Sequence, residues 1–235
     1  MSWTGAFGRA CGALLYRIVR GLALTKISPN VYTAIGLLIS IVAATLFGKA
    51  SGDNTAQLFR YAGLVIIFAG FLDMIDGRIA RATNQVTVFG AFFDSVVDRY
   101  SDAALYFGLL VYYARGNRFF YVVLAAVVMI SSVMVSYTRA RAESLIGTCK
   151  VGFMERPERL VLVIIGALFN RMAPVLWVIA VLSSITVIHR ILYTYQRTKP
   201  LAVPQPIADA KQYSLVDAKR PVDSKVQVSA PVRPH

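Results

Sequence analysis

The sequence has 235 residues, of which 57% are hydrophobic and only 16% charged, and its mean hydropathy is +0.58. This composition argues against a disordered chain, a coiled coil and a secreted disulfide scaffold, and it indicates an integral membrane protein. The formal net charge is +13. Because the basic residues lie between long apolar runs, we expect them to face a membrane surface and not a nucleic acid.

Residues 1–27 are predicted to form an interfacial amphipathic helix. At 100° per residue, Arg9, Arg17 and Arg20 fall on one face. Six mostly apolar residues fall on the opposite face: Trp3, Phe7, Cys11, Leu14, Leu15 and Ile18. This pattern is typical of a helix that lies in the plane of the lipid headgroups.

Residues 28–196 are predicted to be an all-α domain of six transmembrane helices. Each apolar stretch approaches the ~20 residues needed to cross a bilayer, although the fifth is shorter. The stretches lie at about 31–48, 60–77, 89–113, 119–138, 159–170 and 174–195. Ser28 and Pro29 mark the start of the first. Small residues would let neighbouring helices approach closely in the first and third: Thr33, Gly36, Ser40, Ala44, Ala103, Ala104 and Gly108.

The loop charges predict the orientation of the chain. Lysines and arginines are more numerous before the first stretch and after the second, fourth and sixth than in the opposite loops. We therefore expect a multi-pass protein of the inner, cytoplasmic membrane with both termini in the cytoplasm. Residues 197–235 contain six of the nine prolines and no long apolar run, so they are predicted to be a disordered cytoplasmic tail.

Acidic residues gather where apolar helices are predicted, between Asp73 and Asp102. These 30 positions hold five of the nine acids in residues 1–196. Asp73 and Asp76 are three residues apart, and Asp94 and Asp98 are four apart, so each pair shares one helical face. Because a short turn joins the two helices, we expect four carboxylates to meet at the cytoplasmic boundary. Asp102, one turn further on, is expected to pair with Arg99 or to orient another arginine.

Four neighbouring carboxylates repel one another unless they bind a cation or become protonated. Oxygen ligands favour a hard ion such as Mg²⁺, Mn²⁺ or Ca²⁺, and Mg²⁺ usually keeps positions for substrate phosphates. Arg81 could bind a phosphate, and Gly77 and Gly90 leave room for a ligand near the backbone. The pattern suits cleavage of a pyrophosphate. The alternative is structural ion pairing with Arg78, Arg81 and Arg99, but three arginines do not neutralise five acids.

The residues from Asp73 to Asp98 match the pattern D-x2-D-G-x2-A-R-x8-G-x3-D-x3-D at every specified position. In this the chain resembles the CDP-alcohol phosphatidyltransferase family, over residues ~5–196. The resemblance implies six transmembrane helices preceded by a juxtamembrane amphipathic helix, and often a homodimer. It also implies that an alcohol attacks CDP-diacylglycerol (CDP-DAG) and that CMP departs.

The resemblance assigns roles to the residues of the motif. It implies that Asp73, Asp76 and Asp94 bind Mg²⁺ or Mn²⁺, and that Asp98 both contacts the metal and deprotonates the acceptor hydroxyl. It places the cytidine diphosphate against a set of mostly small residues: Asp76, Gly77, Ala80, Arg81 and Gly90.

A second group of residues is predicted to bind the phosphate of the acceptor. Arginine is the side chain best suited to a phosphomonoester, and four arginines lie near the expected cytoplasmic ends of helices: Arg139, Arg141, Arg159 and Arg190. Arg156 is either a further contact or a charge that sets the topology. The segment resembles family members that use a phosphorylated polyol, such as phosphatidylinositol-phosphate and phosphatidylglycerol-phosphate synthases. Inositol phosphate is favoured over glycerol 3-phosphate.

Two other classes of protein are alternatives. A divalent-cation channel or transporter would also place acids within the membrane, but it predicts acids throughout the bilayer depth, and these cluster near one edge. A membrane-anchored interaction protein would leave the acid cluster unexplained.

Overall fold

The computed structural model describes the backbone of residues 28–82 and 87–199, and the side chains of these ranges except those of 76–82. The predicted amphipathic helix at 1–27 and most of the predicted tail lie outside the described residues. The described part is all-α, as expected. Its elements are α2 (Pro29–Lys49), the 3₁₀ helix η1 (Gly52–Asn54), α3 (Thr55–Ala82), α4 (Val88–Arg115), α5 (Phe119–Ile146), α6 (Arg156–Leu168) and α7 (Met172–Thr198).

Four helical segments within the described ranges are long and apolar enough to cross a membrane: Pro29–Lys49, Gly52–Ile75, Phe119–Ile146 and Met172–Thr198. Helix α4 is as long as α5, but its first half carries acids and an arginine. Helix α6 has 13 residues and, at 1.5 Å per residue, is about 20 Å long, which is shorter than the hydrocarbon core of a bilayer.

Most helix bounds agree with the sequence pattern to within three residues, but α3 extends five residues beyond the expected 60–77 at each end, and the end of α5 also differs. Ser28 is the N-cap residue of α2 and Pro29 follows it, although the Ser28 hydroxyl makes no capping hydrogen bond. Helix α5 ends at Ile146, eight residues beyond the expected end at 138. The added segment, rich in Ala, Arg and Glu, favours a helix, and Gly147 at φ 77° ends it. Arg139, Arg141 and Glu143 therefore lie on a helix.

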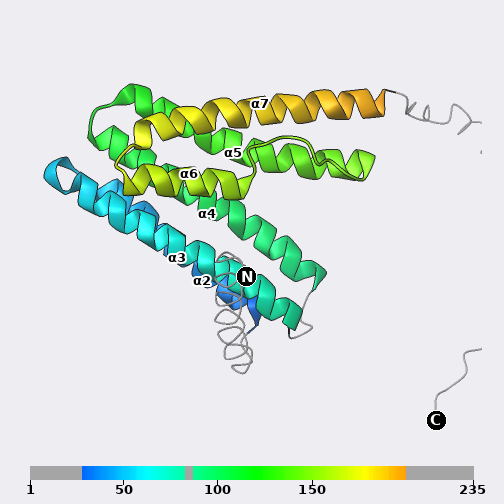
Figure 1. Cartoon of the computed structure of the whole chain (residues 1–235), viewed down its shortest axis with the longest axis horizontal. Helices are drawn as coiled ribbons and strands as arrows, with labels where there is room; N and C mark the ends of the chain where they lie inside the picture. Colours follow the sequence, from blue (N-terminus) through cyan, green and yellow to red (C-terminus); the bar gives the residue numbers. More distant parts are fainter. Residues whose placement is uncertain (1–27, 83–86, 200–235) are drawn as a thin grey trace, which may run out of the picture.

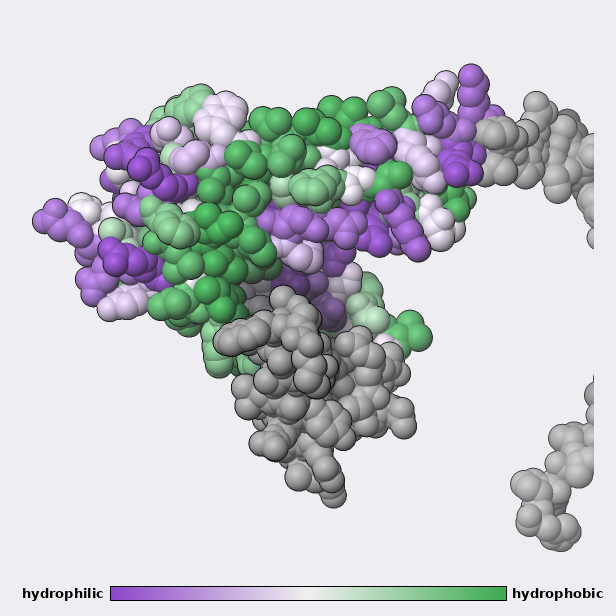
Figure 2. Space-filling model, viewed as in Figure 1, coloured by the Kyte–Doolittle hydropathy of each residue, from purple (hydrophilic) through white to green (hydrophobic). Residues whose placement is uncertain are grey.

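The helices form two layers that cross. Helix α2 packs against α3 and α4, and α5 packs against α4 and α7 (Figure 1). Helix α6 packs against both α3 and α7. Figure 2 shows apolar residues over the middle of the molecule and hydrophilic residues at the end that contains the α2–α3, α4–α5 and α6–α7 turns. This distribution fits a bundle whose middle lies in hydrocarbon.

Helices α2 and α4 approach each other closely, as the small residues predicted. A Cβ atom added at Gly108 would lie 2.3 Å from the carbonyl oxygen of Ala44, so only glycine fits there. Gly48 also faces α4, where its added Cβ would lie 3.3 Å from a methyl carbon of Val111. Gly36, by contrast, has nothing within 4 Å of such an atom.

The main hydrophobic core occupies the half of the bundle that lies away from the acidic residues. It is built from the second halves of α2 and α4, the first halves of α3, α5 and α7, and the second half of α6. Phe47, Phe59, Leu109, Val128 and Leu176 are almost fully buried in it. The opposite half of the bundle, where α3 ends and α4 and α6 begin, carries the polar side chains.

Candidate active site

Three of the predicted metal ligands converge. Asp73 lies near the end of α3, and Asp94 and Asp98 lie near the start of α4. Each offers a carboxylate oxygen, and these oxygens all lie within 4.8 Å of one another. All three residues are partly buried. The spacing of four residues thus has the effect that helical periodicity predicts, since Asp94 and Asp98 share a face of α4.

The side chains of Asp76, Gly77, Ala80 and Arg81 lie outside the described residues, so their roles stay predictions. Asp76 belongs to α3, three residues after Asp73. Gly90 lies in the first turn of α4, where its N–H donates to the hydroxyl of the N-cap residue Thr87. A Cβ atom at Gly90 would lie 2.9 Å from that hydroxyl oxygen and 3.3 Å from the Oδ1 atom of Asn30. A side chain at position 90 would therefore crowd Thr87 and Asn30 at the start of α4, and glycine avoids this contact.

Arg156, at the start of α6, joins the acids of α3 and α4. Its Nη1 atom lies 3.0 Å from Asp73 Oδ2 and 2.8 Å from Asp98 Oδ1. Its Nε atom lies 3.6 Å from Asp102 Oδ1. Burial lowers the pKa of the Arg156 guanidinium, but the three facing carboxylates outweigh burial and raise this pKa above its ordinary value. The side chain therefore remains cationic.

Asp102 forms a second, deeper ion pair. Its Oδ2 atom accepts a hydrogen bond from Arg159 Nη2 at 2.7 Å, and Arg159 is only 2% exposed. Arg159 also donates to the carbonyl of Met154 at 3.3 Å. Asp102 thus orients arginines of α6, one of the two roles expected for it, while Arg99 donates to the carbonyl and hydroxyl of Ser95.

The acid cluster has more carboxylates than arginines paired with them. Among the described side chains, the guanidinium groups of Arg156 and Arg159 form the ion pairs with the four carboxylates of Asp73, Asp94, Asp98 and Asp102, and Asp94 has no such pair within 4.0 Å. The available donors are carboxylate oxygens only. This donor set fits a hard divalent ion such as Mg²⁺ or Mn²⁺ and does not fit zinc, which favours nitrogen and sulfur ligands.

A cavity of about 380 Å³ lies beside the acids. Asp98 and Asp102 of α4 line one side, and α5, α6 and α7 contribute polar side chains to the rest: Ser136, Arg139, Glu143, Glu155, Arg156 and Arg190. Asp98 therefore belongs both to the acid cluster and to the cavity wall. The volume is in the range of small-molecule sites.

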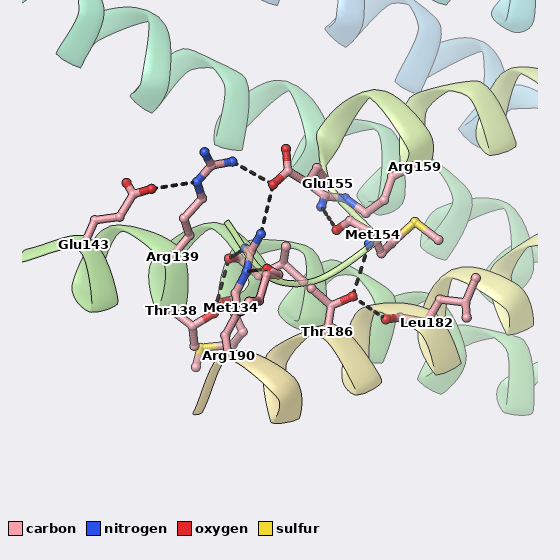
Figure 3. Close-up of polar contacts among 12 residues, drawn as sticks. Met134, Thr138, Arg139, Glu143, Met154, Glu155, Arg159, Leu182, Thr186 and Arg190 are labelled. Carbon is pink, nitrogen blue, oxygen red and sulfur yellow. Dashed lines mark hydrogen bonds and ion pairs between the residues drawn. The ribbon is translucent and has the colours of Figure 1, made fainter. Parts of the chain in front are cut away.

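Two arginines of the cavity are held by one carboxylate (Figure 3). Glu155 Oε1 accepts hydrogen bonds from Arg139 Nη1 at 2.7 Å and from Arg190 Nη2 at 3.1 Å. Arg139 Nε also donates to Glu143 at 3.0 Å. Arg190, only 1% exposed, donates to the carbonyls of Val151 at 2.8 Å and Val135 at 2.5 Å. These bonds fix both guanidinium groups at the cavity wall.

The loop before α6 places Glu155 at this point. The Met154 N–H donates to the Thr186 hydroxyl of α7 at 3.2 Å (Figure 3). Gly152 has φ 101°, and an added Cβ would lie 2.5 Å from the Thr186 methyl carbon. The loop can therefore lie directly on α7 only with glycine at this position.

The structure does not bring the four predicted phosphate-binding arginines together. Arg139 and Arg190 line the cavity. Arg141 is exposed and lines a different pocket between α5 and α7, with Thr194. Arg159 is buried against Asp102 and does not line the cavity. Arg156, which the sequence left open as a further contact or a topology-setting charge, lines the cavity. Glu155 was not singled out as a site residue from the sequence; the available signal was two charges immediately before a proline at a helix start.

Comparison with known proteins agrees with this geometry. The family model for CDP-alcohol phosphatidyltransferase matches residues 26–196. The chain belongs to the CDP-alcohol phosphatidyltransferase family. It is therefore an enzyme, a transferase, and the resemblance of its sequence motif is confirmed.

Relatives of this phosphatidyltransferase include archaetidylinositol phosphate synthase of Pyrococcus horikoshii, 39% identical over 78% of this chain and 92% of the relative. Phosphatidylinositol phosphate synthase of Mycobacteroides abscessus is 37% identical over 79% of this chain and 84% of the relative. The crystal structure of Mycobacterium tuberculosis phosphatidylinositol phosphate synthase with CDP-DAG bound superposes with a TM-score of 0.69 at 30% identity, covering 78% of this chain and 94% of that one. The same enzyme in complex with manganese and citrate gives a TM-score of 0.67 at 31% identity, covering 77% of this chain and 88% of that one.

Proposed function

We propose that this chain is a phosphatidylinositol phosphate synthase, which transfers the phosphatidyl group of CDP-DAG to a hydroxyl of inositol phosphate and releases CMP. The observation that carries this proposal is the position of Asp98, which belongs to the acid cluster and also lines the arginine-bearing cavity. A carboxylate in that position would lie between a nucleotide-linked donor and a phosphorylated acceptor. The names of the relatives support the same acceptor.

Asp73, Asp76, Asp94 and Asp98 would hold Mg²⁺ or Mn²⁺, and a related synthase has been crystallised with manganese. When bound, such an ion would offset charge on the diphosphate of the donor and on the departing CMP. Asp76, Gly77, Ala80, Arg81 and Gly90 would bind the cytidine diphosphate, as the family motif implies.

Asp98 would accept the proton of the acceptor hydroxyl. The hydroxyl oxygen then bonds to the phosphorus that carries the lipid, and the bond from that phosphorus to the CMP oxygen breaks, with the electron pair leaving on CMP. The products are the new phosphodiester, CMP and a proton on Asp98 that passes to solvent.

The cavity arginines would bind the phosphate of the acceptor. Arg139 and Arg190 are held at the wall by Glu155, and Arg156 lies on the border between the cavity and the acids. Fixed guanidinium groups lose little conformational freedom on binding a phosphate. Arg141 and Arg159 have less support for this role, because their side chains lie outside the cavity.

The membrane arrangement completes the proposal. The four apolar helices would span the bilayer, and α4 and α6 would complete a six-helix domain. The acids would lie at the cytoplasmic edge of this domain. The amphipathic segment 1–27 would rest on the same surface, with both termini cytoplasmic. The enzyme would act as a homodimer in the inner membrane, where the lipid chains of CDP-DAG stay in hydrocarbon.

The decisive experiment measures CMP release by the purified full-length chain with CDP-DAG, Mg²⁺ or Mn²⁺, and one of four acceptors: inositol phosphate, glycerol 3-phosphate, free inositol or serine. We expect inositol phosphate to give the highest kcat/KM. Faster turnover with glycerol 3-phosphate would reassign the chain to phosphatidylglycerol-phosphate synthesis. A preference for an unphosphorylated alcohol would contradict the role of the arginines.

The matched variants are Asp98→Asn and Asp53→Asn. Asp98→Asn should lower kcat by a factor of about 10² or more, since it removes the proposed base. Asp53 is exposed in η1, at the opposite end of the bundle, and its substitution should leave turnover unchanged. Full turnover by a folded Asp98→Asn protein would contradict the proposed mechanism.

A further inference from the structure

Arg156 contacts two of the three carboxylates that a bound cation would also need. Its Nη1 atom lies 3.0 Å from Asp73 and 2.8 Å from Asp98, and both acids belong to the cluster whose oxygens lie within 4.8 Å of one another. A guanidinium and a divalent ion repel each other and cannot both bind these carboxylates at full strength. Arg156 therefore competes with the ion.

The same side chain has a second environment within reach. Its Nε atom is buried, lies 3.6 Å from Asp102 Oδ1 and makes no hydrogen bond among the described residues. Leaving a buried donor without a partner is unfavourable, so the contact with the acids is not optimal for this guanidinium. A small rotation toward Asp102 would satisfy Nε. Arg156 also lines both the cavity of about 380 Å³ and a smaller pocket beside Asp73.

The backbone that carries Arg156 is held in place. Arg159, one turn further along α6, is buried in its pair with Asp102, and Pro157 restricts the first turn of the helix. Movement between the two environments therefore involves the side chain of Arg156 and leaves α6 where it is.

We propose that Arg156 is an exchangeable counter-ion. It neutralises Asp73 and Asp98 when no divalent ion is bound, and on ion binding it turns to Asp102 and presents its Nη groups to the phosphate of the acceptor in the cavity. This inference rests on the proposed function, because it requires that the acids bind a metal. It predicts that Arg156 weakens metal binding and strengthens phosphate binding.

The test measures two affinities of the full-length chain by titration calorimetry. The first is for Mn²⁺ alone, and the second is for inorganic phosphate with Mn²⁺ saturating. For Arg156→Gln we expect Mn²⁺ to bind about tenfold more tightly, because the guanidinium no longer competes with the ion for the carboxylates. We expect phosphate to bind about tenfold more weakly, because one charge-assisted contact is lost. The two changes have opposite signs, whereas damage to the site would weaken both.

Arg139→Gln is the matched control. It removes a cavity arginine that pairs with Glu143 and Glu155 and contacts none of the three clustered aspartates. It should change Mn²⁺ affinity by less than a factor of two while weakening phosphate binding. Equal effects of the two substitutions on Mn²⁺ affinity would overturn the proposal, because they would reflect net charge alone.

Arg156→Lys keeps the test decisive if Arg156→Gln does not fold. Lysine retains the charge but has only one nitrogen, so it cannot face Asp102 while it contacts Asp73 and Asp98, and Mn²⁺ should bind severalfold more tightly than in the unmodified chain. Unchanged Mn²⁺ affinity in both variants overturns the exchange. Failure of the unmodified chain to bind Mn²⁺ would instead contradict the proposed metal site itself.

Discussion

Asp102 and Arg159 form the ion pair whose loss should most affect the folded state. Arg159 is 2% exposed, so Asp102→Asn would leave a buried guanidinium without its counter-charge. Breaking such a pair from one side costs about 3–5 kcal/mol. We predict a clearly lower melting temperature for Asp102→Asn in detergent, with Asp53→Asn close to the unmodified chain. Equal melting temperatures would show that Arg159 finds another partner.

Glu155 holds two arginines at the cavity wall, and we propose no substrate contact for Glu155 itself. Glu155→Gln should loosen Arg139 and Arg190 together, and the partial exposure of Glu155 limits the effect. We predict a rise of about 3–10-fold in KM for the acceptor, with little change in KM for CDP-DAG. Glu143→Gln affects Arg139 only and should give a smaller rise, as steady-state kinetics with varied acceptor would report.

The sequence predicts the acidic side of the site better than its basic side. Asp94 and Asp98 are four residues apart on one helix, so helical periodicity alone places them on the same face. The arginines are different, because their positions depend on contacts between helices. Arg159 turns to Asp102 across α6 and α4, and Arg141 faces away from the cavity on α5. No local pattern distinguishes them from Arg139.

Helices α2 and α4 touch through backbone at Gly108, and this contact gives a prediction at the scale of elements. Gly108→Ala would force a methyl group against the Ala44 backbone, and overpacking of this kind costs about 1–3 kcal/mol. Gly36→Ala places the same methyl group in open space and should be neutral or slightly stabilising. Thermal unfolding of the two variants should therefore differ in direction. A stable Gly108→Ala protein would mean that the helices separate easily.

Helix positions follow from the apolar runs because membrane-spanning segments have few alternatives to helix. The predicted runs at 31–48, 89–113 and 174–195 lie inside α2, α4 and α7, which extend at most three residues beyond them. The end of α5 was wrong because hydropathy marks where hydrocarbon would end, while the helix continues through polar helix-forming residues to Gly147. That extension carries Arg139 to the cavity.

At the scale of the whole molecule, the loop charges predict which end faces the cytoplasm. Asp53→Cys and Ser144→Cys place exposed thiols at opposite ends of the bundle, in η1 and in the last turn of α5. In a chain with Cys11→Ser, and with Cys149 buried, a membrane-impermeant maleimide should label only Asp53→Cys on intact cells. Ser144→Cys should react after permeabilisation. The reverse pattern would place the acid cluster outside.

The main core and the proposed catalytic groups occupy different halves of the bundle. The core residues of α4 lie from Leu105 onward and those of α7 lie no further than Ala180, whereas the cavity wall is formed by polar groups near the other ends of these helices. Many substitutions of cavity residues would therefore leave the packing of the main core unchanged. Directed evolution of a new acceptor preference could sample the wall positions other than the buried Asp102 and Arg190 while expression yield and melting temperature stay nearly constant.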